Sequence, residues 1–250
     1  MKIADSHCHL GLFEKPLQVV ENAKKHGIER FFSCATNLES MKKHLGLFAK
    51  EECVKTGLGL HPVDLLKLSE KEIGDSLAFL EENASKCHAI GEIGLDYKYA
   101  KTQKERDLQG KVFSTQVELA VKKKLPIAVH SRLAEQECLE ILESLGAKKV
   151  LLHWFTYSKK SIPRAVENGF FMSCGPVIFS SKKDLEAALA IPQGLLLLET
   201  DCPVSFGGKQ SDPTWVKMVA NELSVHKKEP VEKIVQSAWK NYSRLFDNKP

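Results

Sequence analysis

The sequence lacks several features that would place it in other classes of protein. No apolar run in its 250 residues approaches the roughly 18 residues that a membrane-spanning helix needs. The first residues, Met1–Asp5, lack the charged and then apolar segments of a secretory signal. The seven cysteines are an odd number without a Cys-x-x-Cys pair, so neither a disulfide framework nor a cysteine-bound zinc ion is predicted. We therefore expect a cytoplasmic protein with reduced thiols and no membrane association.

The composition is typical of a globular protein of moderate charge. Hydrophobic residues make up 43% and charged residues 27% of the chain, which excludes a disordered or fibrous protein. No linker, low-complexity stretch or long block of like charge divides the sequence, so we expect a single domain over residues 1–250. The formal net charge of +4 permits a polyanionic substrate without demanding one.

Runs rich in Ile, Val, Leu and Phe alternate with amphipathic segments along the whole chain. Several of the runs are almost entirely apolar, as strands buried on both faces of a parallel sheet are. Eight such strand–helix units in 250 residues predict a (β/α)8, or TIM, barrel. A doubly wound open sheet is the alternative, but no Gly-x-Gly-x-x-Gly phosphate loop follows the first strand. The predicted strands are Ile3–His9, Arg30–Thr36, Val54–Leu60, His88–Gly94, Pro126–His130, Val150–His153, Phe170–Cys174 and Leu195–Glu199.

Helix boundaries are marked by proline and glycine. Pro16 lies near the predicted start of the first helix and Gly27 follows its end. Asn241–Phe246 is predicted to close a final helix that packs outside the barrel. The polar, glycine-rich segment Pro203–Asp212 is predicted to be a loop at the top of the barrel.

Polar side chains gather where the predicted strands end. In a (β/α)8 barrel the carboxyl ends of all strands meet at one mouth, where active sites of this fold lie. The side chains that this topology brings together are His7, His9, His61, Glu92, His130, His153 and Asp201.

His7 and His9 form a His-x-His pair on the first predicted strand. Residues i and i+2 of a strand point to the same face, so both imidazoles can hold one cation. Cys8 then points into the packing, and Asp5, on the same face as the histidines, is placed to orient one of them. A pair of ordinary polar residues is the alternative, and the other candidate ligands at the mouth argue against it.

Glu92 lies in the apolar strand segment Ala89–Gly94, where an unpaired ionised carboxylate would be costly. A bound cation would offset that cost, so we predict two divalent cations bridged by Glu92. Zn²⁺ and Mn²⁺ suit mixed imidazole and carboxylate ligands, whereas Mg²⁺, the third candidate, prefers fewer histidines. Hydrogen-bonded buried histidines are the alternative for each ligand taken alone. The predicted partners of Glu92 are His7, His9 and Asp201 for one ion, and His130 and His153 for the other.

Other residues near the predicted mouth have two interpretations each. His61 is placed to contact substrate rather than to complete the metal shell, or is a structural loop histidine. Glu199 either orients a ligand or forms a salt bridge beside the mouth. Arg132 can pair with a phosphate or with a helix carboxylate. Three aromatic residues can stack on nucleobases or simply pack, namely Tyr97, Trp154 and Phe155.

Seven motifs follow one another in the order Asp5-Ser6-His7-Cys8-His9-Leu10, Gly59-Leu60-His61-Pro62, Ala89–Tyr97, Leu125–Arg132, His153-Trp154-Phe155, Leu198–Pro203 and Asn241–Phe246. In this collinear arrangement, from residue 5 to residue 246, they resemble the TatD family of metal-dependent deoxyribonucleases. The resemblance implies a TIM barrel that hydrolyses DNA phosphodiesters at a dinuclear divalent site, often from a 3′ end. The implied ligands are His7, His9, Glu92 and Asp201 at one metal, and Glu92, His130 and His153 at the other.

The sequence departs from the family at two places. Trp154 is bulky, where the family usually has a small residue or a cysteine after the histidine of the sixth strand. The segment after Pro203, which commonly shapes the substrate site, reads Val204–Gly208 and then Ser211-Asp212-Pro213 instead of the usual aromatic, proline-rich turn, arginine and Asn-Glu-Pro.

We therefore predict a metal-dependent hydrolase of phosphodiesters, a DNase resembling 3′ exonucleases, with DNA as its substrate and no obligate protein partner. In the predicted mechanism Asp201 orients and deprotonates the attacking water, and His61 binds the phosphate or protonates the leaving oxygen. A small-molecule amidohydrolase or lactonase on the same barrel is one alternative, although many of these have a carboxylated lysine where this chain has Glu92. A non-catalytic metal-binding scaffold is the other, and the complete ligand set argues against it.

Overall fold

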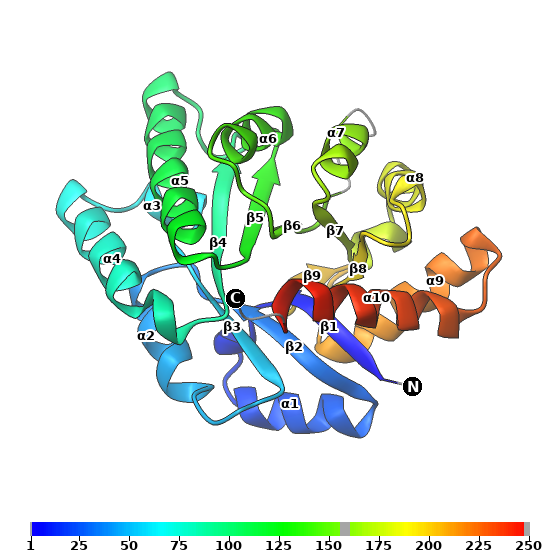
Figure 1. Cartoon of the computed structure of the whole chain (residues 1–250). Coiled ribbons are helices and arrows are strands. Elements are labelled where there is room, and N and C mark those ends of the chain that lie inside the picture. Colours follow the sequence, from blue (N-terminus) through cyan, green and yellow to red (C-terminus); the bar gives the residue numbers. More distant parts are fainter. Residues whose placement is uncertain (1, 156–160, 248–250) are drawn as a thin grey trace.

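A computed structural model of the protein describes residues 2–155 and 161–247, which form a barrel of parallel strands surrounded by helices (Figure 1). The eight barrel strands are hydrogen-bonded in chain order, and each neighbouring pair is parallel. The strands are β1 Ile3–Cys8, β2 Ile28–Cys34, β3 Val54–Leu58, β4 Ala89–Asp96, β5 Ile127–Arg132, β6 Val150–Leu152, β7 Phe171–Cys174 and β8 Leu196–Leu198.

The barrel closes between β1 and β8 through hydrogen bonds near its mouth. The Asp201 N–H donates to the His7 carbonyl oxygen at 3.0 Å, and the His9 N–H donates to the Cys202 carbonyl oxygen at 2.7 Å. A doubly wound sheet has two free edges, so this closure excludes the alternative architecture. The predicted (β/α)8 barrel is confirmed.

Two strands extend further toward the mouth than predicted. β4 continues from Gly94 to Asp96, and β5 continues from His130 to Arg132, because their ladder still pairs Gly94 with His130 and Asp96 with Arg132. The other strand bounds lie within two residues of the predicted ones. The extension places Asp96 inside a strand that also carries Glu92.

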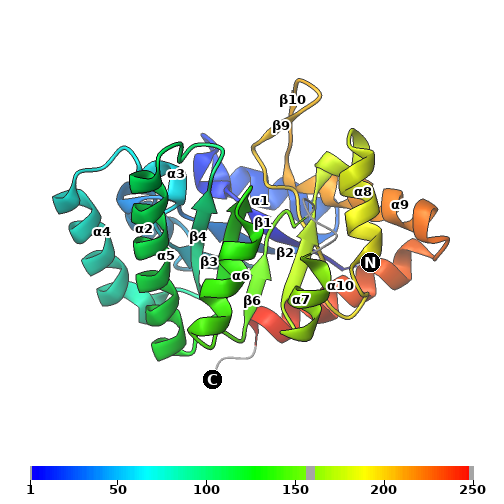
Figure 2. The same cartoon turned by 90° about the horizontal axis from the view of Figure 1, so that it is seen from above.

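Helices cover the outside of the barrel (Figures 1 and 2). The longest, α5, begins where Thr102 and Glu105 cap each other reciprocally, a sequence signature of a helix start. No helix in the described ranges is long and apolar enough to cross a membrane. The helices are α1 Pro16–Lys25, α2 Leu38–Leu47, α3 Pro62–Leu65, α4 Glu70–Asn83, α5 Gln103–Lys123, α6 Glu135–Ser144, α7 Ile162–Glu167, α8 Lys182–Ala190, α9 Val216–Lys227 and α10 Val231–Phe246, with short 3-10 turns at Leu10–Leu12, Ala84–Lys86, Pro176–Phe179 and Pro213–Trp215.

The last helix, α10, lies at the end of the barrel opposite the hairpin of strands β9 (Ser205–Phe206) and β10 (Lys209–Gln210) (Figure 2). Its side chains Tyr242, Leu245 and Phe246 form one buried cluster with residues of β1, β2 and β4–β8. The Tyr242 hydroxyl also donates a hydrogen bond to the Phe31 carbonyl oxygen at 2.9 Å. Asn241–Phe246 therefore closes the final helix, as predicted, and this helix seals the barrel on the side away from the mouth.

The segment 203–212 contains a short hairpin where only a loop is predicted. β9 Ser205–Phe206 pairs antiparallel with β10 Lys209–Gln210, and the two are joined by Gly207 and Gly208 with φ of 58° and 78°. Two successive residues with positive φ favour glycine, and this two-residue turn matches the twist of a hairpin. Figure 2 shows the hairpin projecting well beyond the ends of the barrel strands.

Replacing Asn241 should destabilise the protein. Its buried Nδ2 donates to the carbonyl oxygens of Gln193 (2.9 Å) and Leu196 (2.8 Å), which ties α10 to the start of β8. Asn241→Ala removes the donor from both, so we expect the free energy of unfolding in urea to fall by about 1–3 kcal/mol. Asn221→Ala, at an exposed position of α9, is the matched control and should change it by less than about 0.5 kcal/mol. Equal losses in the two variants would contradict this role of Asn241.

Candidate active site

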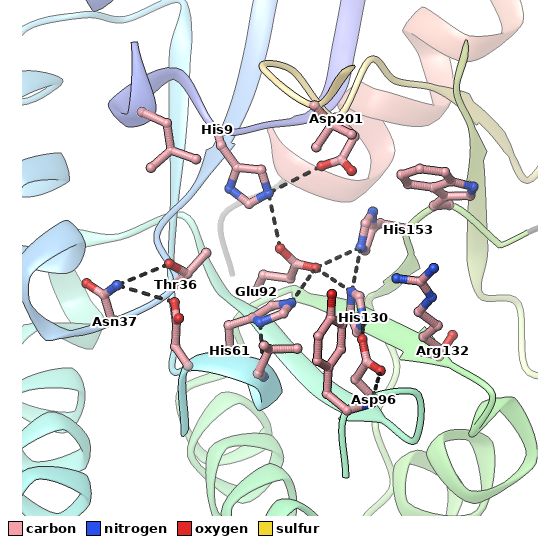
Figure 3. A pocket seen from close by; sticks show the side chains of 17 residues that line it. His9, Thr36, Asn37, His61, Glu92, Asp96, His130, Arg132, His153 and Asp201 are labelled. Carbon is pink, nitrogen blue, oxygen red and sulfur yellow. Dashed lines mark hydrogen bonds and ion pairs between the residues drawn. The ribbon is translucent and has the colours of Figure 1, made fainter. Parts of the chain in front are cut away.

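The side chains predicted at the mouth surround one cavity of about 640 Å³ (Figure 3). His7 does not line the cavity, because it is fully buried with its ring stacked on that of His153 at a centroid distance of 3.8 Å. The other predicted residues line it, namely His9, His61, Glu92, His130, His153 and Asp201. The structure therefore brings together every side chain that the strand ends predict.

His7, His9 and Asp201 face one another at the junction of β1 and β8. The Nε2 atoms of His7 and His9 lie 3.5 Å and 3.3 Å from Asp201 Oδ1. His9 Nδ1 lies 3.1 Å from the Cys34 carbonyl oxygen, a contact that requires the proton on Nδ1. His9 Nε2 is therefore the atom that takes up a further proton or a cation. The predicted common face of the two histidines is observed.

Glu92 lies at the centre, and its two carboxylate oxygens face different histidines (Figure 3). Oε1 lies 2.7 Å from His153 Nε2 and 3.0 Å from His130 Nδ1. Oε2 lies 3.3 Å from His9 Nε2 and 3.5 Å from His7 Nε2. A carboxylate that divides four imidazoles into two pairs has the geometry needed to bridge two cations.

The carboxylates and imidazoles in this cluster shift one another's pKa values toward the charged forms. Burial raises the pKa of Glu92, which is 2% exposed, but the neighbouring histidines, His153 foremost, outweigh burial and hold that pKa well below its usual value. Burial lowers the pKa of His153, His9 and His130, yet the adjoining carboxylates outweigh it and raise all three. The carboxylate thus stays ionised, and these imidazoles bind protons more tightly than a free histidine does.

Two further carboxylates lie beside the ring nitrogens of His130 and His153 that do not face Glu92. Asp96 Oδ2 lies 2.9 Å from His130 Nε2, and Glu199 Oε1 lies 3.6 Å from His153 Nδ1. Carboxylates in such positions fix the orientation of a ligand ring and increase its basicity. The geometry favours the interpretation of Glu199 as an orienting group. Sequence reasoning misses Asp96, although its position four residues after Glu92 on one strand is a usable signal.

Asp5 does not orient a histidine ring, contrary to the prediction. Its carboxylate accepts hydrogen bonds from the Thr200 N–H (3.0 Å) and from the Thr200 hydroxyl. The carboxylate also lies within 4.8 Å of the thiols of Cys8 and Cys202. The pairing of β1 with β2 changes register between Asp5 and Cys8, which interrupts the strict alternation of faces along β1. Asp5 consequently ties β1 to the segment after β8 instead of facing the cavity.

His61 lies within the cluster of potential ligands rather than apart from it. Its Nε2 is 3.5 Å from Glu92 Oε1, and it forms a compact group with Glu92 and His130. Its Nδ1 accepts the Val63 N–H at 3.2 Å, so the neutral ring carries its proton on Nε2. In this form Nε2 donates a hydrogen bond and does not bind a metal ion, which agrees with the predicted contact to substrate.

Only one of the three aromatic residues predicted near the mouth lines the cavity, and that residue is Trp154. Phe155 is buried in the core, and Tyr97 packs against the Arg106 guanidinium at 4.6 Å from its ring centroid. The packing interpretation holds for these two residues. Arg132 lines the cavity and is available to an anionic ligand there.

The backbone at the mouth is strained at three residues. Leu133, Trp154 and Asp201 have φ of 59°, 44° and 51°, and each follows the end of a barrel strand. Non-glycine residues adopt this left-handed conformation at a cost of about 1–2 kcal/mol. Strain of this kind concentrates at functional sites, where the surrounding structure imposes a side-chain direction.

The donor set fits divalent metal ions. His7 Nε2 is fully buried and makes no hydrogen bond within the described residues, a costly state for a polar atom that a cation would relieve. Nitrogen and carboxylate donors in this mixture suit Zn²⁺ or Mn²⁺ better than Mg²⁺. Ligand atoms lie within 4.8 Å of one another in three groups at the mouth, which are His7–His9–Asp201, His7–Glu92–His153 and His61–Glu92–His130.

Comparison with known proteins identifies the family. The family model described as TatD related DNase matches residues 4–247. The chain belongs to this family, whose members are metal-dependent hydrolases. It is 34% identical to the uncharacterized metal-dependent hydrolase YabD of Bacillus subtilis, over 97% of this chain and 98% of that protein. It is 30% identical to the human deoxyribonuclease TATDN3, over 98% of this chain and 94% of that protein.

A solved structure of the family has the same fold. The TatD homologue YjjV of Escherichia coli K12 superposes with a TM-score of 0.87 and 26% sequence identity, covering 99% of this chain and 98% of YjjV. The barrel of the present TatD family protein is thus matched over its whole length.

Removing His7 and His9 together should lower the number of metal ions bound per chain. We expect the His7→Ala/His9→Ala variant to lose metal, measured by elemental analysis, while its circular dichroism stays that of the parent. The exposed pair His26→Ala/His226→Ala removes the same number of imidazoles away from the cavity and should leave metal content unchanged. Unchanged metal content in the first variant would refute the assignment.

Metal binding should release protons. The pKa values of His9, His130 and His153 are raised, so these imidazoles still carry protons at a pH where an ordinary histidine, with a pKa of about 6.5, has lost them. A cation must displace those protons, and its affinity should rise with pH up to and beyond neutrality. Titration calorimetry in two buffers of different ionisation enthalpy measures the protons released. An affinity that does not change between about pH 6 and pH 9 would contradict the raised pKa values.

Proposed function

We propose that the protein hydrolyses phosphodiester bonds of DNA at a dinuclear divalent metal site, in the manner of a 3′ exonuclease. The observation that carries the proposal is the position of Glu92 between two pairs of imidazoles at the barrel mouth. Relatives named as deoxyribonucleases, in human at 30% identity and in Schizosaccharomyces pombe at 33% identity, support DNA as the substrate.

In this proposal the side chains on the two sides of Glu92 would each hold one metal ion. Divalent metal ions supply Lewis acidity, which lowers the pKa of a water molecule and offsets negative charge on phosphoryl oxygens. Zn²⁺, Mn²⁺ and Mg²⁺ are the candidates. The proposed ligands are His7, His9 and Asp201 on one side, His130 and His153 on the other, and Glu92 between them.

Asp201 is the residue that we expect to take a proton from the attacking water. Its side chain lines the cavity beside His9. Burial raises the pKa of this carboxyl, but its hydrogen bond to His9 and the charges of nearby histidines outweigh burial, and the pKa is lowered. Asp201 is therefore ionised at neutral pH, as a general base must be, and it lines the cavity from a left-handed backbone position.

His61 serves best as a hydrogen-bond donor to a phosphoryl oxygen. Protonation of Nδ1 would remove the acceptor for the Val63 N–H, so the local structure favours the neutral ring. Burial foremost lowers the pKa of His61, in the same direction. Of the two predicted roles, phosphate binding is thus better supported than protonation of the leaving oxygen.

The test is a nuclease assay on the purified protein. We expect end-labelled single- and double-stranded DNA to be degraded with Mg²⁺, Mn²⁺ or Zn²⁺ and not with chelator, and a ladder of products shortened from the 3′ end. Turnover of a lactone or a dihydropyrimidine with none of DNA would favour a small-molecule hydrolase. A binding function that persists after metal removal, without any turnover, would favour a scaffold.

Asp201→Asn should reduce the rate of the chemical step. Asparagine keeps the shape of the side chain but loses its charge and basicity, so we expect a reduction of about 10²–10⁴-fold in single-turnover cleavage of DNA. DNA affinity should change far less, because phosphate binding involves other groups. Metal content is measured in parallel.

The control for this substitution is Glu199→Gln. Glu199 does not line the cavity itself and acts on it through neighbours such as His153, so its loss should cost less than the loss of Asp201. An Asp201→Asn enzyme that cleaves at the parental rate would refute the role of a base. A variant that loses both metal and activity would make Asp201 a ligand alone.

A further inference from the structure

Four large apolar or aromatic side chains line the active-site cavity together with its polar and charged groups, and we call these four the rim: Leu12, Tyr99, Trp154 and Val204. Leu12, Tyr99 and Val204 are 63%, 50% and 38% exposed. Hydrolysis of a phosphodiester makes no use of these side chains. Large apolar side chains around a polar site indicate a ligand that also presents an apolar face.

Trp154 is the member of this rim that adjoins a proposed metal ligand in the sequence. It directly follows His153, whose Nε2 contacts Glu92. The backbone N–H of Trp154 donates a hydrogen bond to Ser173 Oγ at 3.3 Å. Its indole nitrogen is buried, so the exposed part of the side chain is carbon surface. The left-handed backbone, with φ of 44°, is unfavourable for a bulky residue and is imposed by the surrounding fold.

The β9–β10 hairpin supports this indole from one side. The ring of Phe206, on β9, lies against the Trp154 ring at a centroid distance of 5.4 Å and an angle of 46°. Tilted aromatic pairs at such distances are stabilised beyond the burial of their area. The turn at Gly207 and Gly208 lets the hairpin fold back, and the hairpin thereby brings Phe206 to the rim.

We propose that Trp154, supported by Phe206, is the stacking platform for a nucleobase of the nucleotide that enters the cavity, and so determines specificity for an unpaired end. The inference rests on the proposed function and adds to it the part of the substrate that is recognised beside the phosphate. Arg132, which lines the same cavity, is placed to pair with a phosphate of that strand. An aromatic surface accepts any base, because every base has a π-face.

The platform implies a preference for single strands and frayed ends. Even the terminal base of a blunt duplex is paired with its partner and stacked on its neighbour, and bringing it into the cavity requires unpairing and unstacking that cost a few kcal/mol. A protein that binds a base face should therefore bind an unpaired end more tightly than the blunt end of a duplex.

The test measures binding separately from cleavage. A labelled single-stranded oligonucleotide is compared, by fluorescence anisotropy in the presence of chelator, with an identical strand whose three nucleotides at the 3′ end are abasic. The parent should bind the normal strand about 5- to 150-fold more tightly, the factor that corresponds to about 1–3 kcal/mol for a stacked base. Trp154→Ala should lose most of this discrimination, and Trp154→Phe should retain part of it.

Trp239→Ala is the matched control. Trp239 lies on α10, beneath the Arg30 guanidinium at 4.1 Å from its ring centroid, and does not line the cavity. Its variant should keep the parental discrimination between the two strands, and circular dichroism verifies that each variant is folded.

Binding and cleavage are measured separately, so stacking on Trp154 and nuclease activity can fail independently. A parent that discriminates through Trp154 but degrades no DNA with any metal would refute the nuclease and support the platform. A parent that does not distinguish the strands, or does not bind them, would overturn the platform, whether or not it cleaves DNA. A Trp154→Ala variant with undiminished discrimination would also overturn it.

Discussion

The arrangement of side chains at the barrel mouth depends on one buried negative charge, the carboxylate of Glu92. Its side chain is 2% exposed and comes from an apolar strand, where an isolated charge would be strongly destabilising. Imidazoles from four other strand ends surround it. Those of His9, His130 and His153 each contact a second carboxylate, from Asp201, Asp96 and Glu199 respectively. Removing one partner leaves an uncompensated charge, so the cluster is held together by mutual neutralisation. The same neutralisation suits the cluster to cations, which would compete with protons for the same nitrogens.

The closure of the barrel and the geometry of the site use the same backbone. The hydrogen bonds that join β1 to the segment after β8 run from Asp201 to His7 and from His9 to Cys202, so three potential ligands lie on the seam itself. Asp5 strengthens the seam by accepting hydrogen bonds from Thr200. At the other end, α10 seals the barrel with Tyr242 and its neighbours. The stable end and the reactive end are thus separated, as is usual for this fold.

Much of the fold and of the candidate site could be predicted from the sequence, for a physical reason. Parallel strands buried on both faces are apolar throughout, so a histidine or carboxylate at a strand end stands out, and barrel topology brings such ends together. Asp5 shows where this fails, because a register change inside β1 cannot be read from a pattern that assumes strict alternation. Asp96 was not predicted as a site residue, because β4 continues two residues beyond its predicted end at Gly94. The hairpin that brings Phe206 to Trp154 turns at two glycines. Its strands show no alternation of apolar and polar residues, so the sequence pattern does not predict them.

The proposed function requires that Glu92 lie between two bound metal ions. Electron paramagnetic resonance of the protein loaded with Mn²⁺ tests it most directly, because two ions joined by one carboxylate are magnetically coupled and separate ions are not. We expect a coupled signal from two ions per chain, and its replacement by the signal of isolated ions in Glu92→Gln. A single uncoupled ion per chain in the parent protein would rule out a bridging Glu92.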